Sequence, residues 1–195
     1  TLLFSESFET DGQSTRYTAT LPFNDGPNDH WNRTDGSDIA NSSSAYSGQD
    51  GMFHWAAEDT DRGGSISPLQ SIEFGGISIV GFQNLQFTGL FAADGFSSGT
   101  HRFDADDYIK VQFSVDGGPF SDGLSFRAAG PVSQQLRQDT DFDDVGDGTA
   151  LTSAFQSFGF SIPNGSTLAL KIEVQMNAGA EEIAFDLLEV GGSVV

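Results

Sequence analysis

The densest group of ligand-type side chains in this sequence is an acidic run in its second half. Asp139, Asp141, Asp143 and Asp147 follow one another at short spacing, and glycine-containing turns accompany them. Calcium takes six to eight oxygen ligands at roughly 2.3–2.6 Å, and a short Asp-rich loop supplies several of them at once. Carboxylates this close repel one another when no cation lies between them. The run therefore predicts a calcium site; the alternative is a solvated acidic loop.

The order of these acids resembles the first part of an EF-hand loop, but the remainder departs from that motif. Asp144 stands where the EF-hand requires glycine, and Ala150 stands where it requires a bidentate Glu. No helical pattern flanks the run. We therefore interpret it as an Asp-rich calcium loop inside a β-protein.

Two further acidic groups lie beside apolar stretches. Asp59 and Asp61, next to Glu58, follow the stretch at 52–57, and Asp104, Asp106 and Asp107 precede a strand-like pattern. Each group is either a cation loop or ordinary turn chemistry, because Asp favours turns on its own account.

The two ends of the chain supply another possible site. Glu6 and Glu9 lie on or just after the first predicted strand, and Asp186 interrupts an apolar segment near the end. A carboxylate inside such a strand is costly unless it is paired or metal-bound. We predict a cation held by Glu9, Asp186 and loop oxygens, which would join the two ends; the alternative is that Asp186 faces water.

Aromatic side chains in polar or glycine-rich surroundings are candidate sugar contacts, because the apolar face of a sugar ring stacks on an aromatic ring. Trp31, Tyr46, Trp55 and Phe96 fit this description, and Arg102 is one of eight cations available to hydrogen-bond a sugar. The competing interpretation places Trp31 and Trp55 in the core, since tryptophan is highly buried on average.

The histidines of the sequence form no catalytic zinc motif. The three histidines, His30, His54 and His101, form no His-Glu-x-x-His motif and no pair with metal-ligand spacing. Glycoside hydrolysis needs two facing carboxylates, and 28 acids would supply such a pair by chance. We therefore predict a protein that is not an enzyme, and a polysaccharide-degrading enzyme is kept as an alternative.

The elements that must position these residues are strands. Apolar and polar residues alternate over 109–115 and 168–176, which predicts antiparallel strands with one buried face. Similar or shorter strands are expected at 3–8, 52–57, 72–74, 85–91, 124–127, 158–162 and 183–190. The run Asp116-Gly117-Gly118-Pro119 predicts a hairpin turn. Many strands with turn signals between them indicate an all-β, two-sheet antiparallel sandwich of the jelly-roll kind.

Composition limits the partners. The chain has 195 residues, 28 Asp and Glu, 8 Lys and Arg, and a net charge of −20. Such acidity argues against binding to nucleic acid or to anionic membranes. The absence of cysteine excludes disulfides and thiolate metal sites. No apolar stretch is long enough for membrane insertion. We expect one domain over 1–195, with 191–195 as the start of a linker or a frayed end.

A resemblance covers nearly the whole chain. It rests on Phe8-Glu9 before a glycine loop, Arg16-Tyr17, Trp31-Asn32-Arg33 and the segments 33–37, 47–51, 111–118, 139–152 and 183–190. This series resembles calcium-bearing jelly-roll modules of secreted bacterial proteins, including carbohydrate-binding modules and laminin-G-like or MAM-like adhesion domains. The resemblance implies a structural calcium on Glu9 and Asp186 and a secreted, extracellular location.

Together these features predict a non-catalytic, calcium-binding module that recognises a polysaccharide or a cell-surface glycan. The alternative is a structural or adhesion block of an adhesin, surface layer or filament, with calcium but no small ligand. That alternative would involve self-association or neighbouring domains of a larger protein.

Overall fold

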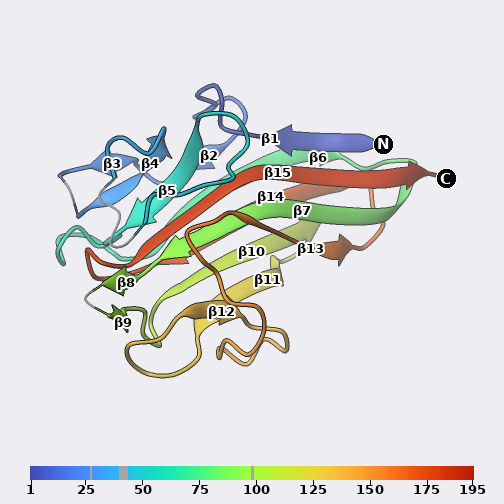
Figure 1. Cartoon of the computed structure of the whole chain (residues 1–195). Coiled ribbons are helices and arrows are strands. Elements are labelled where there is room, and N and C mark those ends of the chain that lie inside the picture. Colours follow the sequence, from blue (N-terminus) through green and yellow to red (C-terminus); the bar gives the residue numbers. More distant parts are fainter. Residues whose placement is uncertain (27, 40–43, 98) are drawn as a thin grey trace.

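Two antiparallel sheets face each other in this molecule and form the predicted sandwich (Figure 1). The computed structural model describes residues 1–26, 28–39, 44–97 and 99–195. The jelly-roll interpretation is confirmed at the level of this all-β, two-sheet architecture. Among the described residues, no helix has the length and apolarity needed to cross a bilayer.

The first sheet carries most of the residues discussed below. Its strand order is β13 (Gln156–Ile162), β7 (Phe82–Asp94), β15 (Glu182–Val194), β5 (His54–Glu58), β4 (His30–Thr34) and β3 (Phe23–Asn24), with β1 (Leu2–Glu6) also paired to β15.

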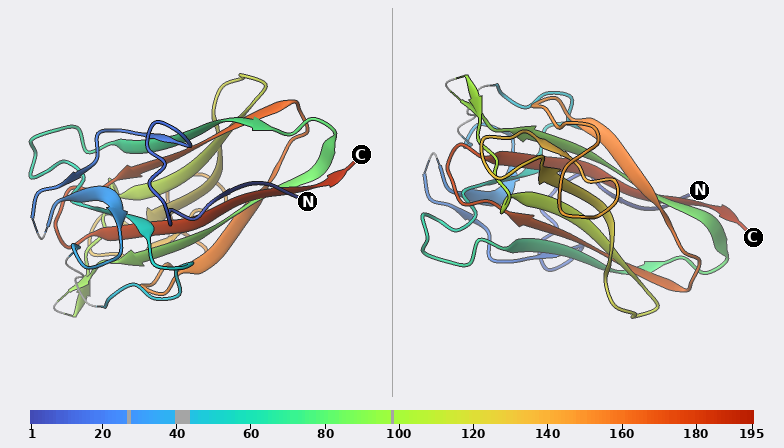
Figure 2. Two further views of the ribbon diagram at one scale, coloured as in Figure 1. Left: turned by 90° about the horizontal axis from the view of Figure 1, so that it is seen from above. Right: turned by 90° about the horizontal axis from the view of Figure 1, so that it is seen from below.

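The second sheet lies across the core from the first (Figure 2). Its order is β12 (Leu136–Gln138), β11 (Ser121–Ala128), β10 (Tyr108–Val115), β14 (Thr167–Gln175), β6 (Gln70–Ser78) and β2 (Thr18–Ala19). A small separate hairpin joins β8 (Phe96–Ser97) and β9 (Thr100–His101).

The alternating patterns form strands because every second side chain enters the core. In β14, Leu168, Leu170, Ile172 and Val174 are buried while the residues between them are partly exposed. The predicted hairpin is also present. Asp116 and Gly117 have φ values of 53° and 73°, and β10 pairs with β11 across this turn.

The two ends of the chain lie side by side, as the jelly-roll interpretation predicted. β1 pairs with β15, and the amino group of Thr1 donates a hydrogen bond to the Gly192 carbonyl at 2.7 Å. The expectation of a linker from residue 191 is wrong for most of that segment. Residues 191–194 belong to β15, because they pair with β1 and β7.

An aromatic cluster fills the space between the sheets. Phe8 lies at its centre and contacts the rings of Tyr17, Trp55, Phe74 and Phe185 at centroid distances of 5.7–6.5 Å. A smaller apolar group covers the outer face of the first sheet; it comprises Ile39, Ala56, Ala92 and Ala184, with Tyr46 and Phe155 packed against them.

Candidate functional site

The acidic loop at residues 139–147 brings three predicted ligands together. One carboxylate oxygen each from Asp139, Asp141 and Asp143 lies within 4.8 Å of the other two. Asp139 is buried and accepts hydrogen bonds from the backbone N–H groups of Asp143 and Asp144 at 3.2 and 3.1 Å, which fold the loop over it. The negative charge of Asp143 raises the pKa of the exposed Asp141 carboxyl. The triad is therefore a concentration of negative charge with two solvent-facing members.

Asp147, the fourth predicted ligand, has a different local partner. Its carboxylate accepts hydrogen bonds at 2.9 Å from the backbone N–H and the hydroxyl of Thr140, and these hydrogen bonds lower its pKa. Asp144 forms an ion pair with Arg127 at 2.5 Å. Neither acid belongs to the group of three whose oxygens lie within 4.8 Å of one another.

An exposed aromatic ring lies in the same loop, and the sequence reasoning missed it. Phe142 is 47% exposed, and nearby Val145 is 45% exposed. Phe142 adopts a φ of 60°, in the left-handed region that side chains with a Cβ rarely enter. The sequence did contain a signal for this exposure, because Phe142 lies between Asp141 and Asp143 and has few apolar neighbours to cover its ring. The loop therefore combines carboxylates with an accessible aromatic surface.

Glu9 and Asp186 converge on one loop, residues 47–53. The exposed Glu9 carboxylate accepts the backbone N–H groups of Met52 and Phe53 at 2.8 and 2.7 Å, and these hydrogen bonds lower its pKa. The buried Asp186 carboxylate accepts the N–H of Asp50 at 2.7 Å. The loop at 47–53 therefore links the segment after β1, through Glu9, to β15, through Asp186.

Burial raises the pKa of Asp186 to about 7, and the negative charges of Asp50 and Glu9 add to the effect. Three carboxylates therefore act on one another at this point. The structure brings Glu9 and Asp186 to a common loop, and their binding of a cation stays a prediction.

Glu6 has a different partner from the one predicted. Its buried carboxylate pairs with Arg16 at 2.7 Å and also accepts the N–H of Phe8 at 2.8 Å. The guanidinium neutralises this carboxylate, so a metal ion is not needed to do so. We therefore correct the assignment of Glu6 from metal ligand to ion-pair partner.

The remaining acidic candidates make turn contacts. Asp61 accepts the N–H of Gly64 at 2.6 Å, and burial together with Asp61 raises the pKa of Asp59 to about 7. Asp104 accepts the N–H of Asp106 at 2.9 Å. Asp59 and Asp61, and Asp104 and Asp106, therefore show the turn chemistry that the sequence left open as an alternative.

The two tryptophans are core residues, so their assignment as sugar contacts is wrong. Trp31 and Trp55 are 0% and 1% exposed, and their rings pack edge to face at 5.1 Å. Both side chains point between the sheets, where tryptophan buries a large apolar area. A polysaccharide cannot stack on either ring without disrupting the core.

The other predicted sugar contacts differ in accessibility. The Tyr46 hydroxyl is buried, and its ring packs against His54 and Phe155 at 5.6 and 5.8 Å, so it offers no open stacking face. Arg102 is exposed in the segment after β9. Phe96 belongs to β8, but its side chain lies outside the described part of the structure.

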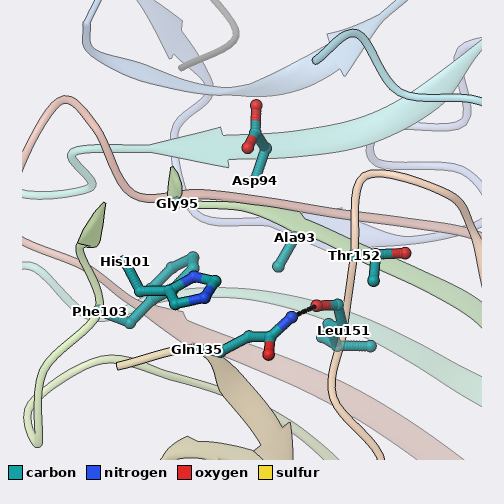
Figure 3. Close-up of a pocket in the computed structure, with 8 residues that line it drawn as sticks. All are labelled: Ala93, Asp94, Gly95, His101, Phe103, Gln135, Leu151 and Thr152. Atoms are coloured by element: carbon teal, nitrogen blue, oxygen red, sulfur yellow. Dashed lines mark hydrogen bonds between the residues drawn. The ribbon is translucent and has the colours of Figure 1, made fainter. Parts of the chain in front are cut away.

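A pocket near His101 is too small for a sugar chain (Figure 3). Its volume is about 120 Å³, whereas ligand pockets commonly span about 300–1,000 Å³. The lining residues are Ala93, Asp94, Gly95, His101, Phe103, Gln135, Leu151 and Thr152. The Gln135 side chain donates a hydrogen bond to the Leu151 carbonyl at 3.0 Å, and the Asp94 carboxylate points away from that pair (Figure 3).

No protein-family model matches this sequence, and no curated protein matches it significantly. Solved structures are similar over almost the whole chain. The K1 cleaved adhesin domain of Lys-gingipain from Porphyromonas gingivalis W83 gives a TM-score of 0.53 at 16% identity, covering 97% of this chain and 98% of that one. The K3 domain gives 0.52 at 13% identity, with 97% of each chain covered.

The CBM22-1 xylan-binding domain from Paenibacillus barcinonensis Xyn10C aligns with 100% of this chain and 96% of its own, with a TM-score of 0.44 and 14% identity. The fold of this chain is the β-sandwich of the gingipain adhesin domains.

Proposed function

We propose that this protein is a secreted, non-catalytic module that binds calcium in the loop at residues 139–147 and uses that loop to recognise a polysaccharide or cell-surface glycan. The observation that carries the proposal is the combination of the carboxylate triad with an exposed aromatic ring in one short loop. The fold that the chain shares with bacterial adhesin domains supports an extracellular binding role.

Calcium is the cation that best fits the triad. Asp139, Asp141 and Asp143 offer only oxygen ligands, and calcium prefers oxygen with a coordination number of six to eight. Three carboxylates leave coordination positions open, which water or the hydroxyl groups of a sugar can occupy. The Glu9 and Asp186 carboxylates are proposed as a second, structural calcium site that joins the chain ends through the loop at 47–53.

Phe142 completes the proposed glycan contact. Its side chain is accessible and lies in the sequence between two of the triad's residues; the proposal is that a sugar ring stacked on it brings hydroxyl groups toward the ion. The net charge of −20 favours neutral polysaccharides over acidic ones.

The test uses a polysaccharide array followed by titration calorimetry, with calcium present. We expect Phe142→Ala and the double variant Asp141→Asn, Asp143→Asn each to weaken glycan binding at least tenfold. Val132→Ala, which trims an exposed apolar residue in another loop, is the matched control and retains binding. A wild-type protein that binds no glycan at millimolar concentration contradicts the proposal.

The second candidate function is a structural block of an adhesin, surface layer or filament. Its support is the adhesin-domain fold, which covers 97% of this chain. In that case the protein self-associates or contacts neighbouring domains and binds no glycan. Sedimentation velocity with and without calcium separates the two functions, because only the structural role requires a concentration-dependent assembly.

A further inference from the structure

A row of ionisable side chains crosses the first sheet on the face opposite the aromatic core. Backbone pairing places four residues directly opposite one another on neighbouring strands, in the order His30 on β4, Glu58 on β5, Glu182 on β15 and Asp94 on β7. Their sequence neighbours Trp31, Ala57, Ile183 and Ala93 enter the main core. Because side chains alternate along a strand, the row points to the outer face.

This row is buried although it lies on an outer face. His30, Glu58 and Glu182 are each 0% exposed. The neighbouring row consists of alanines, over which Ile39, Tyr46 and Phe155 pack. Asp94, at the end of the row, accepts the backbone N–H of Ser44 at 2.9 Å, which fastens the covering segment to the sheet. The four side chains thus occupy a polar layer closed off from solvent.

Several polar atoms in this layer have no hydrogen-bond partner among the described residues. They are both ring nitrogens of His30 and of His54, both carboxylate oxygens of Glu58 and the hydroxyl of Tyr46. Buried polar side chains are nearly always hydrogen-bonded, and each exception requires a physical explanation. Leaving such a group unpaired costs about 1–3 kcal/mol. Two fully buried, unpartnered side chains on adjacent strands therefore point to a bound ligand.

The charge around Glu58 indicates the sign of that ligand. The charged groups that act on its carboxyl are other acids, namely Glu182, Asp29 and Asp59. The Tyr46 hydroxyl also lies in the field of Glu182, Asp94 and Glu58. A cation placed in this layer would offset carboxylate repulsion and accept the free electron pair of an imidazole nitrogen.

We propose that His30, Glu58 and Glu182 bind a divalent first-row transition metal ion of the zinc class. Directly opposed residues on adjacent strands have Cβ atoms about 4.5–5.5 Å apart, which applies to Glu58 with His30 and to Glu58 with Glu182. An ion above the central Glu58, with ligand distances of about 2.0–2.2 Å, is therefore within reach of the side chains on both flanking strands. A mixed nitrogen and oxygen ligand set favours zinc over calcium. Binding requires these side chains to rotate toward the ion, since among the described residues only Asp139, Asp141 and Asp143 already have their ligand atoms within 4.8 Å of one another.

The test is a titration of the whole protein with zinc chloride in buffer saturated with calcium, which occupies the oxygen-only sites. We expect one zinc ion per chain, and an affinity reduced roughly 100-fold or more in His30→Gln and Glu58→Gln, since even outer-shell changes cost 10–100-fold. His101→Gln and Asp141→Asn are the matched controls and retain wild-type zinc affinity. The absence of binding at millimolar zinc, or equal binding by Glu58→Gln, overturns the proposal.

A second measurement needs no variant of the row. In the wild-type protein, ¹⁵N spectra of the imidazole rings report direct coordination, and His101→Gln identifies the His101 signal. His54→Gln likewise identifies the His54 signal, so the remaining signal belongs to His30. We expect zinc to shift a ring nitrogen of His30; a shift confined to His54 or His101 contradicts the site. Zinc binding does not depend on the calcium loop, so failure of either proposal leaves the other to be judged separately.

Discussion

Replacing Glu58 by Gln should stabilise the metal-free protein at neutral pH. Glu58 is fully buried with no partner for either oxygen among the described residues, and desolvation, followed by the charge of Glu182, raises its pKa to about 9. The folded state therefore holds a proton that the unfolded state, with an ordinary pKa of 4.5, has released at pH 7. An acidic group whose pKa is higher in the folded state than in the unfolded state makes the folded state less stable as the pH rises above the unfolded-state pKa.

The size of the stabilisation follows from the interval between the unfolded-state pKa of Glu58 and pH 7. About 2.5 pH units separate the ordinary pKa from pH 7, and each unit is worth about 1.4 kcal/mol. The wild-type protein thus loses about 3 kcal/mol of folding free energy at pH 7 relative to pH 4 through this one carboxyl. Gln has the same shape and no charge, so Glu58→Gln removes the loss.

Urea denaturation followed by tryptophan fluorescence in EDTA measures the difference. We expect Glu58→Gln to be more stable than wild type by about 3 kcal/mol at pH 7 and nearly equal at pH 4. The exposed Glu73→Gln is the matched control and should change neither value. Equal stability of wild type and Glu58→Gln at pH 7 would refute the reasoning.

Three further substitutions test other parts of the structure. Trp55→Ala should lower the unfolding free energy by about 3–5 kcal/mol in urea denaturation, while the folded fraction binds glycan normally; a specific loss of binding would restore Trp55 as a sugar contact. Gly51→Ala places a Cβ 2.6 Å from the Glu9 carboxylate at a φ of +69°, so it should destabilise the protein by more than Gly63→Ala, which has a φ of +64° and open space; equal losses would show that Glu9 is not held there. Arg16→Met leaves the buried Glu6 carboxylate without its partly exposed cation and should cost about 1–3 kcal/mol at pH 7, and a negligible change would mean that Glu6 has another partner.

The strands were predictable because their signal is local. The alternation of apolar and polar residues over 168–176 predicts a half-buried strand, and the structure has strand β14 at residues 167–175. The pairing of β1 with β15 was also predictable, although only from the jelly-roll interpretation. The acidic triad was predictable for the same local reason, since its three residues lie within five positions of one another.

The buried row of His30, Glu58 and Glu182 was not predictable in this way. These residues lie far apart in the sequence, and only the register of β4, β5 and β15 places them opposite one another. A one-residue change in register would send each side chain to the other face. The burial of Trp31 and Trp55 likewise depends on which face of β4 and β5 meets the second sheet, which their polar sequence neighbours did not reveal.

The proposed function depends on glycan binding that requires calcium, and one measurement tests it most directly. The affinity of the wild-type protein for its best polysaccharide on the array is measured by titration calorimetry in calcium, after EDTA treatment, and after calcium is restored. We predict binding in calcium, a loss of at least tenfold after EDTA treatment, and recovery when calcium returns. An unchanged affinity in EDTA, or no polysaccharide bound in calcium, would contradict the proposed function.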